Sequence, residues 1–300
     1  MHNIKFIRKN SELFIKKIKT RNVDLDYKII SDLDEKNRKL ITDKENLERD
    51  KKEISKKKDK TLFQKSKEIS IEIENLTKKQ SEIQNELNKI LSNLPNLPHE
   101  DVPIGKDESS NKVVNTVGSI RNFDFKVKSH FELGEKLNML DFDLATKTTG
   151  SRFVFIKNEL AMLERAISNF MIDLHTKHNG YVEVSPPLIA SSDSMYGTGQ
   201  LPKFENDQFE LKLDDSNERK FLIPTAEVIL TNMVKNQILS IYDLPIRLVA
   251  STPCFRKEAG SYGKDTKGMI RQHQFHKVEL VSIVTPEKCL EELERMTNCA

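Results

Sequence analysis

The sequence predicts an α+β protein in which a long helical hairpin precedes a globular domain, and three observations lead to this prediction. Residues 28 to 94 contain neither Gly nor Pro, the residues that most often interrupt a helix. Prolines then follow in quick succession at positions 95, 98 and 103. Beyond them, helical and strand patterns alternate, and a hydrophobic content of 37% over 300 residues is enough to build a sizeable core.

Heptad repeats predict the hairpin, an arm that spans about residues 28 to 94. The first seam has a leucine or isoleucine at every seventh residue, with polar residues at its other core position: Leu33, Leu40, Leu47 and Ile54, against Asn37, Lys44 and Lys51. A second seam, from Ile69 to Leu94, alternates spacings of four and three, as coiled coils do. Between the two seams lies KKKDKTLFQ, residues 56–64, where we expect the chain to reverse.

Basic charge is concentrated near the expected tip of this arm. Residues 49–67 hold nine cations and three acids, a difference of six, whereas the whole chain carries a formal charge of +3. A solvated helical face would explain such a run. A surface that follows the phosphates of a nucleic acid would explain it equally well, and its affinity would fall as salt rises.

The remaining composition narrows the class of protein. Cys254, Cys289 and Cys299 form no CxxC pair, which argues against a structural zinc site or a disulfide framework and favours a reducing compartment. No apolar run reaches the ~18 residues that a membrane-spanning helix needs. The N-terminus alternates apolar and charged residues rather than forming the apolar core of a signal peptide. We therefore expect a cytoplasmic protein that does not enter a membrane.

The prolines after the arm predict a domain boundary, with one domain at 1–103 and the other at 104–300. In the second domain, residues 157–178 read as an amphipathic helix, whose apolar stripe holds Leu160, Leu163, Ile167, Phe170 or Met171, and Leu174. Residues 181–189 read as a strand that ends at its prolines, and 247–256 and 273–284 read as two further strands.

Residues 255–280 combine cations, carboxylates and an aromatic ring in one segment. If the first strand extends far enough, Arg256 and Glu258 share one of its faces. In the second strand Phe275, Lys277 and Glu279 share a face, with Phe275 and Glu279 about 13 Å apart. An aromatic ring can stack on a base, an arginine can hold a phosphate, and a carboxylate can bind an ammonium. The segment therefore predicts a site for an aminoacyl nucleotide.

These residues also carry a family resemblance. FRKEAGSYGKDTKGMIRQHQF, residues 255–275, resembles motif 2 of class II aminoacyl-tRNA synthetases in the form typical of seryl-tRNA synthetases. PTAEV at 224–228 resembles the serine-recognition element of that family, and the segments at 195–204 and 95–111 resemble two further stretches. The helical arm is similar to the tRNA-binding arm of the family. The resemblance implies a class II catalytic domain on a mainly antiparallel sheet.

Roles follow residue by residue from the resemblance. It assigns the tripeptide from Arg256 to ATP, with Arg256 as the catalytic residue on the α-phosphate, and it places Phe275 on the adenine. The residues implied for serine are Thr225, Ala226, Glu227 and Glu279. Those implied for ATP are Arg256, Lys257, Glu258 and Phe275, and those for tRNA are Lys56, Lys57 and Lys58. No metal ligand is expected in this chain.

The implied activity is that of a serine–tRNA ligase. It would use ATP with Mg²⁺ to convert L-serine to seryl-adenylate and then charge tRNA(Ser), with tRNA(Sec) as a second acceptor. The helix at 157–178 and the strand through Pro187 resemble motif 1, which implies a homodimer. Two positions depart from the family, because Lys257 stands where serine is common and His276 where Asp or Asn is common. Motif 3 is not found after Glu279, so we expect the chain to be the first part of a longer protein.

Other interpretations of the same residues stay open. Taken alone, Glu227 is a typical acid in the first turn of a helix, Phe275 a core residue, and Arg256 with Glu258 a surface ion pair. Two alternative functions are a non-catalytic tRNA-binding fragment and a ligase that charges a carrier protein with an amino acid. A purely structural coiled coil would leave residues 195–204 and 255–280 unexplained.

Overall fold

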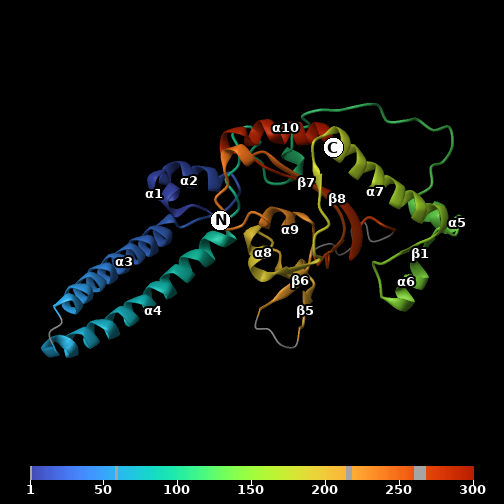
Figure 1. Ribbon diagram of the computed structural model, residues 1–300. Coiled ribbons are helices and arrows are strands. Elements are labelled where there is room, and N and C mark those ends of the chain that lie inside the picture. Colours follow the sequence, from blue (N-terminus) through green and yellow to red (C-terminus); the bar gives the residue numbers. More distant parts are fainter. Residues whose placement is uncertain (1, 58–59, 214–217, 260–267) are drawn as a thin grey trace. The chain divides into compact units, whose positions relative to one another are not determined.

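The computed structural model of the protein describes residues 2–57, 60–213, 218–259 and 268–300 (Figure 1). The chain forms two compact units, Met1–Ser119 and Ile120–Ala300. Among the described residues, no helix is both long and apolar enough to cross a membrane.

The first unit is helical. Its elements are α1 (Ile4–Lys9), α2 (Ser11–Lys19), α3 (Tyr27–Lys56), η1 (Lys60–Leu62), α4 (Phe63–Asn93) and η2 (Glu108–Ser110). The two long helices α3 and α4 lie side by side as a hairpin (Figure 1), which confirms the predicted coiled-coil arm. The polar position that interrupts the first seam is satisfied inside the arm, because Asn37 donates to Gln84 at 2.9 Å and accepts from Gln80 at 3.0 Å.

The base of the arm has its own core. Phe14 and Ile18 of α2 are fully buried against the start of α3 and the end of α4, where Ile30 and Leu87 are also buried. Beside this core, Arg8 donates two 2.8 Å hydrogen bonds to Asp34. Burial alone would raise the pKa of the Asp34 carboxyl, but these bonds and nearby positive charge outweigh it and lower that pKa. The ion pair therefore joins α1 to the root of the arm.

The second unit mixes helices with short and long strands. Its first half contains α5 (His130–Lys136), β1 (Leu140–Asp141), α6 (Phe142–Thr148), β2 (Phe155–Ile156), α7 (Asn158–His178), β3 (Val182–Glu183), β4 (Ile189–Ser191) and α8 (Ser192–Gly197). Its second half contains η3 (Glu205–Asp207), β5 (Glu210–Leu211), β6 (Lys220–Leu222), α9 (Glu227–Asn232), η4 (Ile241–Asp243), β7 (Ile246–Phe255), β8 (Gln274–Ile283), η5 (Pro286–Lys288) and α10 (Cys289–Cys299).

The strands form three small sheets, and most of their pairings are antiparallel, as predicted. Their orders are β1–β2, β3–β7–β8 and β4–β6–β5, and only the β3–β7 pair among the described strands is parallel. The single strand predicted at 181–189 is wrong. The chain forms β3 in one sheet and β4 in another, because the two prolines at 186 and 187 lack the N–H groups that a continuous ladder requires.

Helix α7 matches the predicted helix, and most of its predicted apolar stripe is exposed. The side that packs on the sheet carries Ile172 and His175, both buried. The large apolar residues of the other side are exposed by 41% to 64%: Met162, Leu163, Ile167, Phe170 and Met171. This helix is therefore apolar on both sides.

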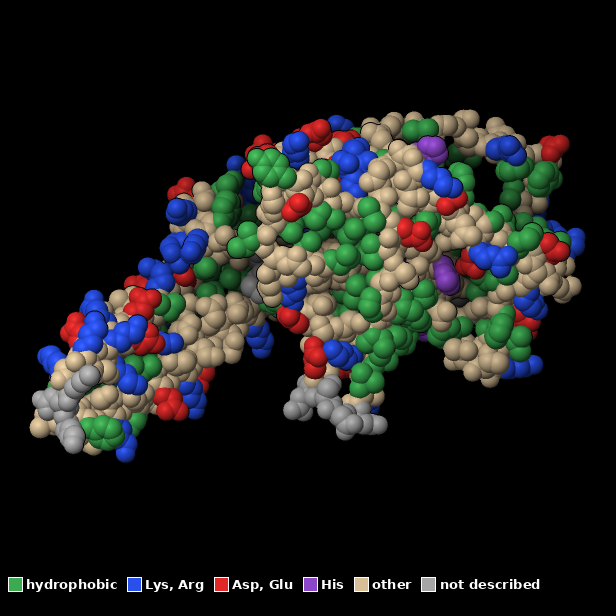
Figure 2. All heavy atoms as spheres, in the orientation of Figure 1, with side chains coloured by type: hydrophobic (Ala, Val, Ile, Leu, Met, Phe, Trp, Pro, Cys, Tyr) green, Lys and Arg blue, Asp and Glu red, His purple; other side chains and the backbone are tan. Residues whose placement is uncertain are grey.

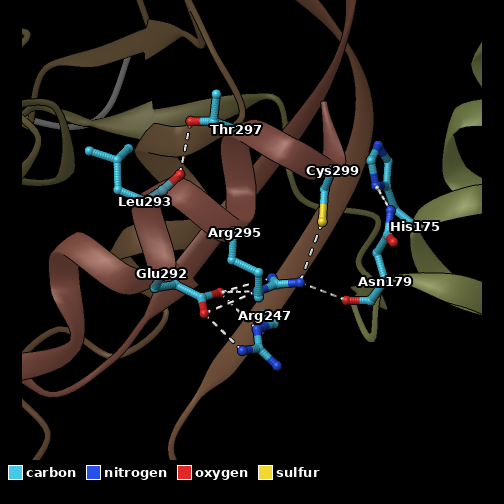
Figure 3. Close-up of polar contacts among 8 residues, drawn as sticks. All are labelled: His175, Asn179, Arg247, Glu292, Leu293, Arg295, Thr297 and Cys299. Carbon is cyan, nitrogen blue, oxygen red and sulfur yellow. Dashed lines mark hydrogen bonds and ion pairs between the residues drawn. The ribbon is translucent and has the colours of Figure 1, made fainter.

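A charged cluster fixes α10 to the sheet (Figure 3). Arg247 of β7 donates to both carboxylate oxygens of Glu292, at 2.7 and 2.8 Å. Arg295, one turn further along α10, also donates to Glu292 and reaches the backbone oxygen of Asn179 at 3.2 Å. The hydrogen bonds from Arg247 outweigh burial and hold the pKa of the Glu292 carboxyl far below its usual range. The cluster therefore ties α10, β7 and the end of α7 together.

Candidate active site

The β7–β8 ladder is the platform of the candidate site. The two strands pair over ten residues, with Cys254 opposite Phe275 and Ala250 opposite Glu279. Since side chains alternate along a strand, Phe275, Lys277 and Glu279 project from one face. The opposite face carries Val278 and Leu280, which pack against the buried cluster that includes Ile172 of α7. His276 belongs to that opposite face by the same alternation.

Arg256 and Phe275 meet at one end of this face. The backbone N–H of Arg256 donates to the carbonyl of His273 at 3.0 Å, so the ladder holds Arg256 just beyond the end of β7. Its guanidinium carbon lies 5.2 Å from the centre of the Phe275 ring, a cation–π distance. Its Nε donates to the carbonyl of Pro224 at 3.3 Å. A planar cation and a half-buried aromatic ring therefore stand together, as predicted.

Thr225, Lys277 and Glu279 form a closed triangle of polar contacts at the other end. The Thr225 hydroxyl donates to Glu279 Oε2, and the Lys277 ammonium pairs with the same oxygen. Lys277 Nζ also donates to Thr225 Oγ1 at 2.7 Å. Thr225 is buried, whereas the side chains of Lys277 and Glu279 are 30% and 19% exposed. A ligand can thus reach the carboxylate although its position is fixed by the protein.

Glu227 begins α9 beside this triangle and has an exposed side chain. Crowding by surrounding protein atoms and the negative charge of Glu279 raise its pKa, and the cations Lys277 and Arg256 oppose that rise. The neighbouring Ala226 is fully buried in a cluster with Leu230 and Leu248. The structure therefore brings Thr225, Glu227 and Glu279 together, while Ala226 lies in the core below them.

Lys257 and Glu258 leave this face, which corrects the expectation that Arg256 and Glu258 share one side of an extended strand. Strand β7 ends at Phe255, and Glu258 adopts a left-handed φ of 51°. The Glu258 carboxylate accepts from Arg271 at 3.0 Å. Lys257 Nζ lies 5.7 Å from the centre of the Phe209 ring, away from Phe275. The strand breaks because its backbone turns to bond with another segment.

Sequence reasoning missed that other segment. Asp207 accepts from the backbone N–H of Lys257 through its carbonyl and from that of Ala259 through Oδ1, both at 2.8 Å. On another side, Arg152 donates to the carbonyl of Glu258 at 3.0 Å. Neither contact leaves a sequence pattern, because a backbone partner can be any residue. Lys277 was placed on the face of Phe275 and Glu279 by the same alternation, but it was given no role.

The predicted tRNA-binding lysines belong to the first unit. Lys56 ends α3, Lys57 caps it, and both are exposed. Lys58 lies outside the described residues. Basic side chains, with acids between them, cover the visible side of the α3–α4 arm (Figure 2). Within the described ranges of both units, no group of three or more His, Cys, Asp or Glu side chains could hold a metal ion.

Two models of known protein families match the chain, and they define its class. Residues 208–300, which contain the platform, match the family model "tRNA synthetase class II core domain (G, H, P, S and T)". Residues 1–98, which contain the arm, match the model "Seryl-tRNA synthetase N-terminal domain". The second unit thus carries a class II synthetase core, and the arm points to one branch of that class.

Individual relatives agree with both family models. The serine–tRNA ligase of Pelagibacter ubique (strain HTCC1062) is 67% identical over 300 residues, which are 100% of this chain and 72% of the relative. That of Ehrlichia canis (strain Jake) is 48% identical over 309 residues, with the same coverage. The chain therefore belongs to the seryl-tRNA synthetase family.

Solved structures support the same assignment. The seryl-tRNA synthetase of Pyrococcus horikoshii, complexed with ATP, superposes with a TM-score of 0.85 at 33% identity, covering 99% of this chain and 73% of that one. The cytoplasmic serine–tRNA ligase of Naegleria fowleri, in complex with AMP, gives 0.82 at 26% identity, covering 99% and 70%.

Proposed function

We propose that this chain activates L-serine with ATP and transfers the seryl group to tRNA(Ser), with tRNA(Sec) as a second acceptor. One observation carries the proposal. At one end of a single face of β8, Phe275 pairs with Arg256, and at the other end Glu279 pairs with the hydroxyl of Thr225. The first pair suits a base and a phosphate, and the second suits an ammonium and a hydroxyl. In this assignment, residues 104–300 activate serine and residues 1–103 recognise tRNA.

The first step joins serine to the α-phosphate. The serine carboxylate oxygen attacks the α-phosphorus of ATP, which reaches the site as its Mg²⁺ complex, and the bond to the pyrophosphate oxygen breaks. Arg256 neutralises charge that grows on the α-phosphate oxygens, while Phe275 stacks on the adenine. Lys257 and Glu258 complete the ATP-binding segment. Positioning and electrostatic stabilisation supply the rate, because no protein side chain forms a bond to the substrate.

The second step consumes the adenylate. A terminal hydroxyl of tRNA attacks the seryl carbonyl, the new ester forms and AMP leaves. Selection of serine depends on hydrogen bonds to its hydroxyl, since an amino acid that lacks this group would leave buried polar atoms unpaired. The proposed serine contacts come from the TAE element and the end of the platform: Thr225, Ala226, Glu227 and Glu279. Exclusion of threonine would depend on steric fit, which discriminates less strongly.

The arm would bind tRNA through Lys56, Lys57 and Lys58. These lysines would contact the phosphate backbone and recognise the shape of the RNA rather than its bases. The exposed apolar side of α7 fits a homodimer, in which a second copy of the chain would cover Ile167 and Phe170. We expect the assembly in the cytoplasm, where its substrates occur.

The test is serine-dependent exchange of pyrophosphate into ATP, which reports the first step alone. We expect exchange with L-serine but not with L-alanine. Arg256→Lys keeps the charge but loses the planar fork, and it should lower exchange by ~10²- to 10³-fold, as loss of one transition-state donor does. Arg121→Lys, in an exposed irregular segment, is the matched control and should retain full activity. Exchange that does not depend on serine would refute the proposal.

A further inference from the structure

The polar triangle at the serine end contains a residue that no role yet explains. Lys277 reaches Thr225 Oγ1 at 2.7 Å and pairs with Glu279 Oε2. Its ammonium therefore contacts both groups to which the serine end of the site is assigned. A lysine ammonium is also the same chemical group as the ammonium of an amino acid, so its presence needs a physical reason.

The two carboxylate oxygens of Glu279 differ in their contacts. Oε2 accepts from the Thr225 hydroxyl and from Lys277. No hydrogen bond from another described residue reaches Oε1. A carboxylate with one oxygen fixed and the other available presents a defined direction to an incoming ammonium.

Charge balance gives Lys277 a second effect. Glu227 of α9 and the buried thiol of Cys254 both lie within electrostatic range of Glu279, Lys277 and Arg256. Arg256 lies over the Phe275 ring at the opposite end of the face. Lys277, by contrast, contacts Glu279 directly. Its positive charge therefore offsets the repulsion between the neighbouring carboxylates of Glu227 and Glu279.

We propose that Lys277 is a positioning residue that orients Glu279 and Thr225 for recognition of the serine ammonium and offsets the repulsion between Glu227 and Glu279. This inference rests on the proposed function. It adds a residue to which neither the motif nor the comparisons assign a role. Because Lys277 does not itself contact the reacting atoms, its effect is on serine binding rather than on the chemical step.

The decisive variant is Lys277→Met, which keeps the length of the side chain and removes its charge. We expect the KM for serine in the exchange assay to rise roughly 10- to 100-fold, the range for loss of a hydrogen bond to a charged group. The kcat of exchange should change much less, because Lys277 acts on serine binding. The KM for ATP should stay unchanged.

Two further variants separate positioning from general damage. Lys277→Arg restores the cation and should restore most of the affinity for serine. Lys235→Met is the matched control, because Lys235 has the same 30% exposure and also forms a salt bridge, but with the exposed Asp193 on the surface. It should leave the KM for serine unchanged.

Each outcome has a distinct meaning. Serine affinity equal to or tighter than wild type in Lys277→Met would overturn the inference, since Lys277 would then compete with the substrate. A variant in which kcat falls as much as serine affinity, and which arginine does not rescue, would also overturn it and leave a structural role. If the wild-type chain lacks serine-dependent exchange, the proposed function itself fails. Calorimetric titration of L-serine reads out the same effect without turnover.

Discussion

The cluster around Glu292 offers the sharpest prediction about stability. Its carboxylate accepts five hydrogen bonds from Arg247 and Arg295 and is the least exposed member of the cluster. Glu292→Gln keeps the shape but removes the charge and places an N–H₂ group against two guanidiniums. Breaking a buried ion pair on one side costs about 3–5 kcal/mol. The arginine side chains are 26% and 30% exposed and can be rehydrated, so we expect the lower limit, about 3 kcal/mol.

The assay is thermal unfolding followed by circular dichroism. For a unit of this size, each kcal/mol shifts Tm by roughly 2–4 °C, so the variant should melt about 6–12 °C below wild type. Glu294→Gln, an exposed position on the same helix, is the control and should not shift Tm. A Glu292→Gln variant that melts together with this control would refute the idea that the cluster holds α10.

The pH dependence adds an independent check. Because the hydrogen bonds from Arg247 depress the pKa of Glu292 in the folded state, its stabilisation is fully present above the unfolded value of about 4.3 and is lost as pH falls toward the folded value. The difference in Tm between wild type and Glu292→Gln should therefore stay constant from pH 8 to pH 5.5. A difference that shrinks within that window would contradict the assigned charge state.

Four further outcomes follow from the structure. Reversing the charges of Lys56 and Lys57 to Glu should weaken tRNA charging and leave pyrophosphate exchange intact; equal loss in both assays would exclude a separate tRNA-binding tip. Ile167→Glu should convert a dimer to monomers in analytical ultracentrifugation, and an unchanged mass would count against the α7 interface. Glu227→Gln should raise the free energy of unfolding slightly at pH 8, by less than about 1 kcal/mol because the side chain is exposed, and by less at pH 4, since a raised folded pKa means that stability falls as pH rises; Tm at the two pH values checks this. Gly268→Ala should destabilise by at least ~1 kcal/mol in urea unfolding, because φ is +79° and a Cβ would lie 2.2 Å from a histidine ring nitrogen; wild-type stability would disprove the strain.

The sequence was most informative where a repeated pattern had one physical cause. The heptads predicted α3 and α4, because only burial against a partner helix requires such spacing. Alternation along β8 likewise predicted that Phe275 and Glu279 share a face. Even the polar position at Asn37 has a local explanation, since two glutamines on α4 satisfy it.

Prediction failed where the deciding contact lies far away in the chain. The apolar stripe on α7 was predicted without its covering surface, because a pattern of apolar residues does not reveal whether the protein's own sheet or another surface covers it. Glu258 was expected in a strand, but the backbone turns there to reach Asp207 and Arg152. Lys277 was placed on the face of Phe275 and Glu279 but given no role, because its partner Thr225 reaches it only after β8 and the start of α9 pack together.

The hydrogen bonds from Asp207 have a thermodynamic consequence for any nucleotide that enters the site. They fix the backbone on both sides of Glu258 before a ligand arrives, and the carbonyl of Ile223 fixes Phe255 in the same way at 2.9 Å. This segment therefore loses its conformational entropy during folding and not when the nucleotide binds. Binding then has less disorder to remove, so a larger share of the contact energy is expressed as affinity.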